Sequence, residues 1–294
     1  MEIKKRIIDW IDGYFHYIAT MPTLILIGLI IGFPTFYLVY ESLHVHNVLR
    51  QQFYFAGLEN FVKMWQNADF RRYFLQTAIF TVGNVGVAFS VSLALAVALS
   101  KNIKFKPFFL AVILLPWTIP PVSSAILWGW VLNRMYGAAN IILTYLGFRK
   151  YFFLGNPVSA MICLILVDAW VRIPLSVLVL YAGLQRVPLE LEDAARVDGA
   201  TMWQIFWKIK FHFIRPEVSM VLILLTMFAW REFSLPWTLT GGGPEDTTEI
   251  FGITIYRQAN LYLRYGYAAA IGMFVLMLTV VLAYFLFKIR PKET

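Results

Sequence analysis

Ionisable side chains inside long apolar stretches are the residues of this sequence with the clearest capacity for chemistry. Asp168 and Arg172 lie in the apolar run 157–181, and their i, i+4 spacing places both on one face of a helix. Charges in a membrane-spanning segment are costly unless they are paired or hydrated. The two residues therefore form either a structural ion pair or a group that contacts or gates a solute. Arg231 and Glu232 are adjacent, so their side chains diverge and each needs a partner elsewhere.

Tryptophan residues lie close to these charges in the sequence. Aromatic faces suit sugar rings, although tryptophan belts at the membrane interface explain most of these positions equally well. We predict a translocation pathway that is lined by charged and aromatic side chains. Its candidate residues are Trp128, Asp168, Trp170, Arg172, Trp230, Arg231 and Glu232.

The sequence contains no arrangement of residues that is typical of an enzyme. Paired carboxylates, a His-Glu metal pattern and a Ser/His/Asp constellation are all missing, and the four histidines fall in interfacial or loop segments. No Gly-x4-Gly-Lys-Ser/Thr phosphate loop occurs. The run Gly241-Gly242-Gly243-Pro244 lacks the lysine, and Pro244 removes a backbone donor that a phosphate would need. We predict no catalytic residue, no metal site and no cofactor bound by this chain.

A charged, amphipathic stretch at 188–215 separates two apolar runs. Pro188 and the acidic residues after it favour the start of a helix, and Gly199 can take the left-handed conformation that ends it. Thr201 and Gln204 form a capping box for a second helix. The pattern predicts a helix, a glycine turn and a helix. The second helix has an apolar face that needs a partner, either a protein or the membrane surface: Met202, Ile205, Phe206, Ile209 and Phe213.

The same stretch resembles the EAA loop of ABC-importer permease subunits, in which Glu-Ala-Ala is followed at fixed spacing by Gly, Ile and Leu-Pro. Asp193-Ala194-Ala195, Gly199 and Ile209 keep that register, while Asp replaces the leading Glu and Phe211-His212 replaces Leu-Pro. The resemblance implies a coupling helix that sits in a groove of a separate ATPase subunit. The residues that it implies for ATPase coupling are Glu192, Asp193, Ala194, Ala195, Asp198, Gly199, Trp203 and Phe206.

A glycine-rich loop extends the resemblance to the sugar-type permeases of this family. Leu239-Thr240-Gly241-Gly242-Gly243-Pro244 and Thr247-Thr248 are similar to their outer loop, although three glycines also make a plain tight turn. The resemblance implies that Gly241, Gly242, Gly243 and Pro244 contact a solute-binding protein. Further motifs of the subfamily occur in the expected order: Gly57-Leu58-Glu59-Asn60-Phe61, Leu115-Pro116, Gly137 with Asn140, Ala182-Gly183-Leu184-Gln185, and Gly266-Tyr267-Ala268 with Ala270.

The resemblance implies an importer built from two membrane subunits, two ATPase subunits that bind ATP and Mg, and an extracytoplasmic solute-binding protein. This chain would be a permease subunit for a sugar, paired with a different second permease, and would do no covalent chemistry. Permeases for amino acids or phosphate are the nearer alternative. A secondary transporter would more often show an internal repeat, which this sequence lacks.

The composition requires lipid as the solvent of this chain. Of its 294 residues, 60% are hydrophobic and 14% charged, which is more apolar surface than one soluble core buries. The net charge of +8 comes from basic residues that flank apolar spans, so we expect no nucleic-acid partner. The single cysteine, Cys163, excludes an internal disulfide, and residues 1–20 do not read as a cleavable signal peptide.

The apolar runs predict an all-α membrane protein with six transmembrane helices in the type I ABC importer permease fold. Residues 1–20 are predicted to form an N-terminal interfacial amphipathic helix, and residues 21–294 the transmembrane permease domain. Proline residues interrupt the third span, which favours a position beside a pathway that can satisfy the freed carbonyls. The predicted spans are 21–40, 74–99, 108–132, 157–181, 216–237 and 266–287.

Lysine and arginine residues set the expected orientation. Basic clusters directly follow the second and sixth spans, at 101–106 and 288–292, and such clusters mark cytoplasmic segments. We therefore predict a multi-pass protein of the plasma or inner membrane. Both termini and the 188–215 loop would lie in the cytoplasm, whereas 41–73, 133–156 and 239–265 would lie outside.

Overall fold

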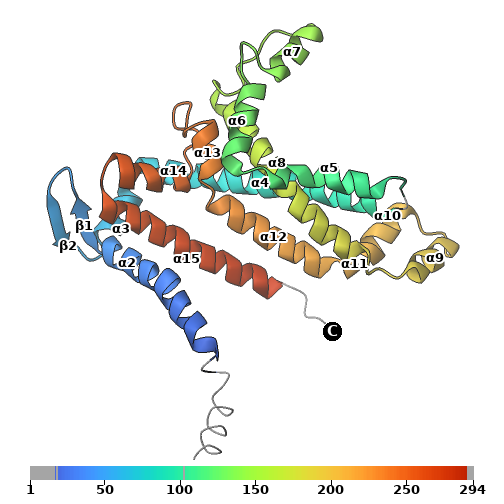
Figure 1. Ribbon diagram of the computed structural model, residues 1–294, viewed down its shortest axis with the longest axis horizontal. Coiled ribbons are helices and arrows are strands. Elements are labelled where there is room, and N and C mark those ends of the chain that lie inside the picture. Colours follow the sequence, from blue (N-terminus) through green and yellow to red (C-terminus); the bar gives the residue numbers. More distant parts are fainter. Residues whose placement is uncertain (1–16, 18, 102, 290–294) are drawn as a thin grey trace, which may run out of the picture. The chain divides into compact units, whose positions relative to one another are not determined.

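Figure 1 shows the computed structural model, which describes residues 17, 19–101 and 103–289. Apart from one β-hairpin, the regular structure of these residues is helical. The chain divides into two compact units, Met1–Gln66 with Gln258–Met273, and Asn67–Arg257 with Phe274–Thr294. The predicted interfacial helix at 1–20 falls almost wholly outside the described residues, so it stays a prediction.

The first unit contains the first apolar span and the hairpin. A continuous helical stretch covers Ala19–Ser42 and includes η1 (Gly28–Gly32) and α2 (Phe33–Ser42). The hairpin strands β1 (His44–Asn47) and β2 (Gln52–Phe55) pair antiparallel, and α3 (Glu59–Gln66) follows. The Asn60 side-chain amide donates to the backbone carbonyls of Ser42 and His44, at 3.0 and 2.8 Å. This buried amide fixes the end of the span against the start of α3.

Two long helices that pack along each other, α4 (Ala68–Ser100) and α8 (Pro157–Leu184), form the centre of the second unit (Figure 1). Asn67 and Asn156 cap their N-termini through side-chain oxygens. The buried face of α4 carries small residues such as Ala88, Ser92 and Ala96. Small side chains let the two backbones approach, as they do between membrane helices generally.

The third apolar span is broken, as its prolines predict. It consists of α5 (Lys106–Thr118) and α6 (Pro121–Val131), whose axes differ in direction by 99°. A proline forces the residue before it out of the helical region, and Ile119, which precedes Pro120, is extended with ψ 125°. A short helix, α7 (Ala138–Tyr145), follows in the predicted outer segment.

The 188–215 segment forms α9 (Leu189–Val197), α10 (Met202–Ile205), the π-helical turn η2 (Phe206–Lys210) and α11 (Phe211–Phe213). The fifth span, α12 (Arg215–Trp230), meets the preceding helix at 74°. The expected extension of this span to residue 237 is wrong. The helix ends at Trp230, and α13 (Ser234–Leu239) begins separately because the Glu232 carboxylate accepts hydrogen bonds from the backbone N–H groups of Phe233 and Leu235.

The C-terminal part consists of α14 (Phe251–Tyr256), η3 (Arg257–Leu261) and α15 (Tyr265–Ile289). Among the described residues, four helices are long and apolar enough to cross a membrane, or up to six if each bent pair counts as one span. This agrees with the six predicted spans.

Candidate functional site

The 188–215 segment forms the predicted helix, glycine turn and helix. Gly199 ends α9 with φ +78°, in the left-handed region, and no atom lies within 4 Å of the position that its Cβ would take. The Thr201 hydroxyl accepts from the Gln204 backbone N–H at 3.3 Å, and the Gln204 side chain accepts from the Thr201 N–H at 2.8 Å. Backbone conformation, and not crowding, therefore requires a glycine at 199.

Glu192 connects the two helices of this segment. Its carboxylate lies 2.7 Å from Lys210 Nζ and 3.7 Å from Arg196 Nη2, and the residue is buried. Asp193, in contrast, is exposed, and its one ion pair within the described part of the chain is with Arg196, at 3.1 Å. Of the three predicted coupling carboxylates, Asp193 and Asp198 are exposed and available to another protein, whereas Glu192 is buried and joins the two helices from inside.

One face of α9 is exposed although it is largely apolar. Leu189 is 71% exposed and Val197 is 89% exposed, and Asp193 lies between them at four-residue steps. Ala194, Asp198 and Gly199 are exposed beside this row, and Ala195 is half-buried. An apolar stripe with a central carboxylate on a short helix outside the membrane-spanning runs is typical of a protein-docking surface.

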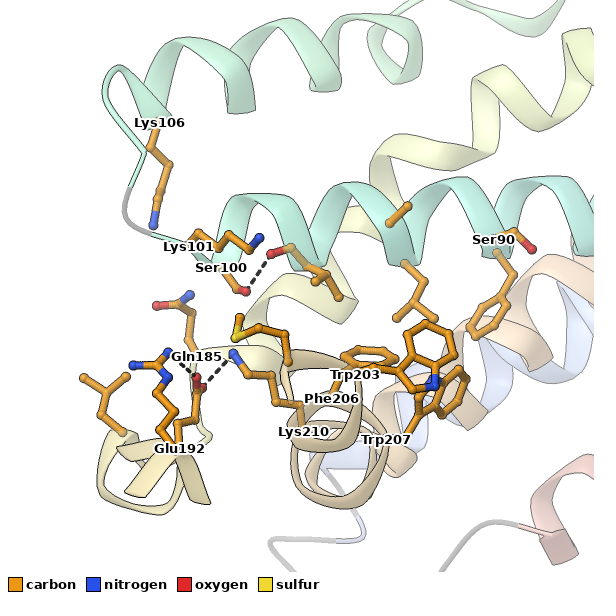
Figure 2. Close-up of a pocket in the computed structure, with 17 residues that line it drawn as sticks. Ser90, Ser100, Lys101, Lys106, Gln185, Glu192, Trp203, Phe206, Trp207 and Lys210 are labelled. Atoms are coloured by element: carbon orange, nitrogen blue, oxygen red, sulfur yellow. Dashed lines mark hydrogen bonds and ion pairs between the residues drawn. The ribbon is translucent and has the colours of Figure 1, made fainter. Parts of the chain in front are cut away.

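The apolar face predicted for the second helix is divided between two surroundings. Ile205 is 1% exposed and belongs to the fold. Trp203 and Phe206, two of the predicted coupling residues, instead border a groove of about 1120 Å³ against α4 (Figure 2). Ile209 is half-buried, while Met202 and Phe213 are exposed.

Charged side chains from α8 and from the break between α12 and α13 form a buried ionic network in the second unit. The predicted pair forms, with Arg172 Nη2 3.2 Å from Asp168 Oδ1. The same guanidinium binds the Glu232 carboxylate from the break between α12 and α13, and Asn84 Nδ2 of α4 donates to Asp168 Oδ2 at 2.8 Å. The sequence did not identify the partner of Glu232, and it did not point to Asn84. The one feature that could have indicated Asn84 is its position as a single amide side chain in an apolar run.

A small cavity of about 210 Å³ adjoins this network. Arg172 borders it together with Trp117, from the end of α5, and Phe228 of α12. The Arg172 guanidinium carbon lies 5.2 Å from the centre of the Phe228 ring. A guanidinium beside an aromatic face, in a cavity that a second aromatic side chain borders, can contact a polar, ring-shaped solute.

The other candidate pathway residues lie outside this group. Trp128 and Trp170 meet edge to face at 5.6 Å and border the main core. Trp230 is only 5% exposed and packs against Phe74 and Phe251. Arg231 is exposed and has no ion pair among the described residues. The structure therefore brings Asp168, Arg172 and Glu232 together, but not Trp230 or Arg231.

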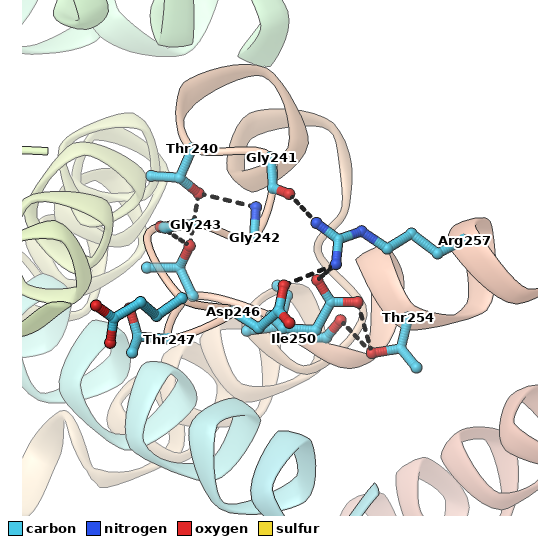
Figure 3. Close-up of polar contacts among 12 residues, drawn as sticks. Thr240, Gly241, Gly242, Gly243, Asp246, Thr247, Ile250, Thr254 and Arg257 are labelled. Carbon is cyan, nitrogen blue, oxygen red and sulfur yellow. Dashed lines mark hydrogen bonds and ion pairs between the residues drawn. The ribbon is translucent and has the colours of Figure 1, made fainter. Parts of the chain in front are cut away.

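The glycine-rich loop is held by Arg257, which sequence reasoning did not single out (Figure 3). Arg257 Nη2 donates to the Gly241 carbonyl at 2.6 Å, and Nη1 lies 2.8 Å from Asp246 and 3.0 Å from Glu249. Gly242 has φ +93°, and a Cβ there would lie 2.3 Å from Glu249 Oε2.

The Gly241–Pro244 turn is therefore held from within by Arg257. Gly241, Gly243 and Pro244 are half-buried, whereas Gly242, also predicted to contact a binding protein, is buried. Glu249 is buried below the turn. Burial raises the pKa of its carboxyl to about 7, against the opposing effect of Arg257. In the described part of the chain, no group of three or more His, Cys, Asp or Glu residues could hold a metal ion.

Comparison with known proteins finds relatives among the membrane components of transport systems. The family model described as "binding-protein-dependent transport system inner membrane component" matches residues 86–292. The trehalose/maltose transport system permease protein MalF of Thermococcus litoralis is 32% identical over 275 residues, covering 93% of each chain. The sulfoquinovosyl glycerol transport system permease protein SmoG of Agrobacterium fabrum is 30% identical over 295 residues, covering 98% of this chain and 94% of that protein.

A solved structure has a similar fold. A chain of a bacterial ABC transporter involved in the import of the acidic polysaccharide alginate superposes with a TM-score of 0.83, covering 98% of this chain and 99% of that chain at 22% identity. At this identity the likeness concerns the fold alone, and it confirms the predicted permease fold.

Proposed function

This chain belongs to the family of binding-protein-dependent transport system inner membrane components, and from that premise we propose that it is the permease subunit of an ATP-driven sugar importer. The observation that carries the proposal is the exposed face of α9 beside the Gly199 turn. Leu189 and Val197 are exposed on one short helix on either side of Asp193, and such a combination of apolar and acidic side chains suits a surface that a partner protein covers. We name residues 188–215 the coupling segment.

The partner proposed for the coupling segment is an ATPase subunit. The segment follows α8 and precedes α12, so a displacement of α9 reaches two spans of the second unit. The Glu192–Lys210 contact makes the segment move as one body. Because docking biases a conformation only if it differs between the two ATPase states, closure of the ATPase pair on ATP and Mg would change its grip on this face.

Sugar transport is proposed from the relatives and from the cavity beside Arg172. Relatives include permease proteins of transport systems for trehalose and maltose, sulfoquinovosyl glycerol, sn-glycerol-3-phosphate and diacetylchitobiose. The Trp117 and Phe228 side chains offer aromatic surface to a sugar ring, and Arg172 offers hydrogen-bond donors to its hydroxyls. The proposal places Asp168 and Glu232 behind Arg172, where they fix its position.

The proposed assembly contains a different second permease, two ATPase subunits and a solute-binding protein that contacts the Gly241–Pro244 turn. The turn supports such a contact because its conformation is fixed from within by Arg257. Both termini and the coupling segment would face the cytoplasm. This chain would form half of the translocation pathway and bind no nucleotide itself.

The proposal is tested by purifying the tagged chain from its native membranes and identifying the proteins that co-purify with it. We expect a second permease and an ATPase, and, after reconstitution with the binding protein, sugar uptake that stops without ATP. Solute flux through the chain alone, without ATP, would contradict the proposal in favour of a secondary transporter.

A further inference from the structure

The groove between α4 and the coupling segment is lined by predicted coupling residues, among them Trp203 and Phe206, and also by two lysines for which ATPase coupling gives no role. It holds about 1120 Å³ and shares no lining residue with the cavity beside Arg172. One wall is the last part of α4, from Phe89 to Lys101, and the other is formed by α9, α10 and η2. The groove is thus separate from the proposed pathway.

The polarity of the groove changes along α4. Phe89, Leu93 and Val97 line its inner part, and Lys101 lies at its end. With a rise of about 1.5 Å per residue, Phe89 and Lys101 are about 18 Å apart along the helix. This is close to the depth of one leaflet, since a whole hydrocarbon core measures about 30 Å.

The polar end of the groove carries an excess of positive charge. Its lining includes four basic residues and one carboxylate, Glu192. Arg196 and Lys210 already pair with that carboxylate. Lys101 and Lys106 have no ion-pair partner among the described residues, and Lys106 Nζ lies 5.7 Å from the centre of the Tyr181 ring. Two uncompensated ammonium groups therefore border an apolar channel.

Indole rings cover the apolar end on the side of the coupling segment. Trp203 and Trp207 contact each other edge to face at 5.4 Å, and both are exposed. Figure 2 shows Lys101 and Lys106 at one end of the groove and the two indoles towards the other, near Ser90. Indoles are favoured where a side chain meets both lipid chains and the interface.

We propose that this groove binds one anionic phospholipid, with its phosphate at Lys101 and Lys106 and its acyl chains along Phe89, Leu93 and the two indoles. The inference rests on the proposed function in one respect: that function puts the coupling segment at the cytoplasmic leaflet, where anionic lipids are enriched. A helix from a second permease fits less well, because it would have to bring carboxylates to this depth. The lipid would fill the space between α4 and the segment, so coupling would depend on anionic lipid.

Quenching by brominated lipids tests the proposal on the full-length protein. The protein is reconstituted in phosphatidylcholine vesicles that contain a small fraction of phosphatidylglycerol or phosphatidylcholine with brominated acyl chains. A Trp203→Phe/Trp207→Phe variant provides the signal of the remaining tryptophans, which is subtracted. We expect brominated phosphatidylglycerol to quench the groove indoles at a mole fraction roughly 25-fold lower than brominated phosphatidylcholine does, since each of the two lysines near an anionic headgroup contributes about fivefold.

Charge variants identify the phosphate site. Lys101→Glu/Lys106→Glu should remove the preference for phosphatidylglycerol. Lys104→Glu, at an exposed lysine that does not line the groove, should keep it. Equal quenching by both lipids in the unmodified protein would overturn headgroup recognition, and no quenching by either would mean that protein covers the groove. The assay contains no ATPase, so the importer proposal and the lipid proposal can fail independently.

Discussion

Glu192 Oε1 lies 2.7 Å from Lys210 Nζ, so an ion pair joins the two helices of the coupling segment across the Gly199 turn. Both side chains are largely buried, and a charged hydrogen bond of this kind contributes about 1–3 kcal/mol. Glu192→Gln should therefore raise the population of locally opened segment. We expect trypsin to cleave after Arg196 roughly 5- to 150-fold faster than in the unmodified protein.

The matched control for that experiment is Asp193→Asn. Asp193 also contacts Arg196, but it is exposed and does not reach the second helix. Asp193→Asn should change the rate of trypsin cleavage by less than about twofold relative to the unmodified protein, because an exposed ion pair contributes little to stability. Equal acceleration by the two variants would show that the Lys210 contact does not hold the segment together.

Within the buried network, the replacement of Arg172 should lower the stability of the protein most. Arg172→Ala leaves the carboxylates of Asp168 and Glu232 both uncompensated, a loss of about 3–5 kcal/mol for a buried pair. Asp168→Asn and Glu232→Gln each leave Arg172 with one carboxylate and should cost less. Melting temperatures of the purified variants rank them, and a smaller loss for Arg172→Ala than for Asp168→Asn would contradict the three-membered network.

The elements that the sequence predicts well are those with local physical signals. The Gly199 turn, the Thr201–Gln204 capping box and the proline break of the third span each depend on neighbouring residues. The Asp168–Arg172 pair was predictable for the same reason, since both residues belong to one helix.

The features that escaped prediction depend on contacts between distant parts of the chain. The partner of Arg172 is 60 residues away, and Glu232 reaches it only because the fifth span ends at Trp230. Arg257 reaches the Gly241–Pro244 turn through a fold of the segment after α13 that no periodic pattern describes. The opposite roles of Glu192 and Asp193 follow from the rotation of α9 against η2, which spacing alone does not specify.

The glycine-rich loop that contains Glu249 should become less stable as the pH rises from about 4.5 to about 7. Burial raises the pKa of Glu249 above its ordinary value of 4.5, so the folded loop retains a proton that the unfolded chain has already lost. The contribution is therefore fully present below about pH 4.5 and is lost through about pH 7. In the Glu249→Gln variant, the melting temperature should decrease less between pH 5 and pH 8 than in the unmodified protein. An unchanged slope would mean that Glu249 does not titrate in this range.

Cysteine labelling from outside tests the orientation. On a Cys163→Ala background, Leu58→Cys should react with a membrane-impermeant maleimide, because Leu58 is 67% exposed in the segment expected outside. Lys104→Cys should react only after the membrane is opened, because basic residues after a span mark the cytoplasmic side. The reverse pattern would invert the orientation and place the coupling segment out of reach of an ATPase.

The central claim is that the Gly199 turn orients α9 so that it binds an ATPase subunit. Gly199→Val forces a β-branched residue into φ +78°, at a strain of about 1–2 kcal/mol, although its side chain meets no atom. Gly199→Asn is the matched control, since asparagine tolerates this conformation. The measurement is the amount of ATPase that co-purifies with each tagged variant, relative to the second permease. We predict that the valine variant loses most of the ATPase and retains the second permease, while the asparagine variant retains both. Full retention of the ATPase by the valine variant would contradict the claim.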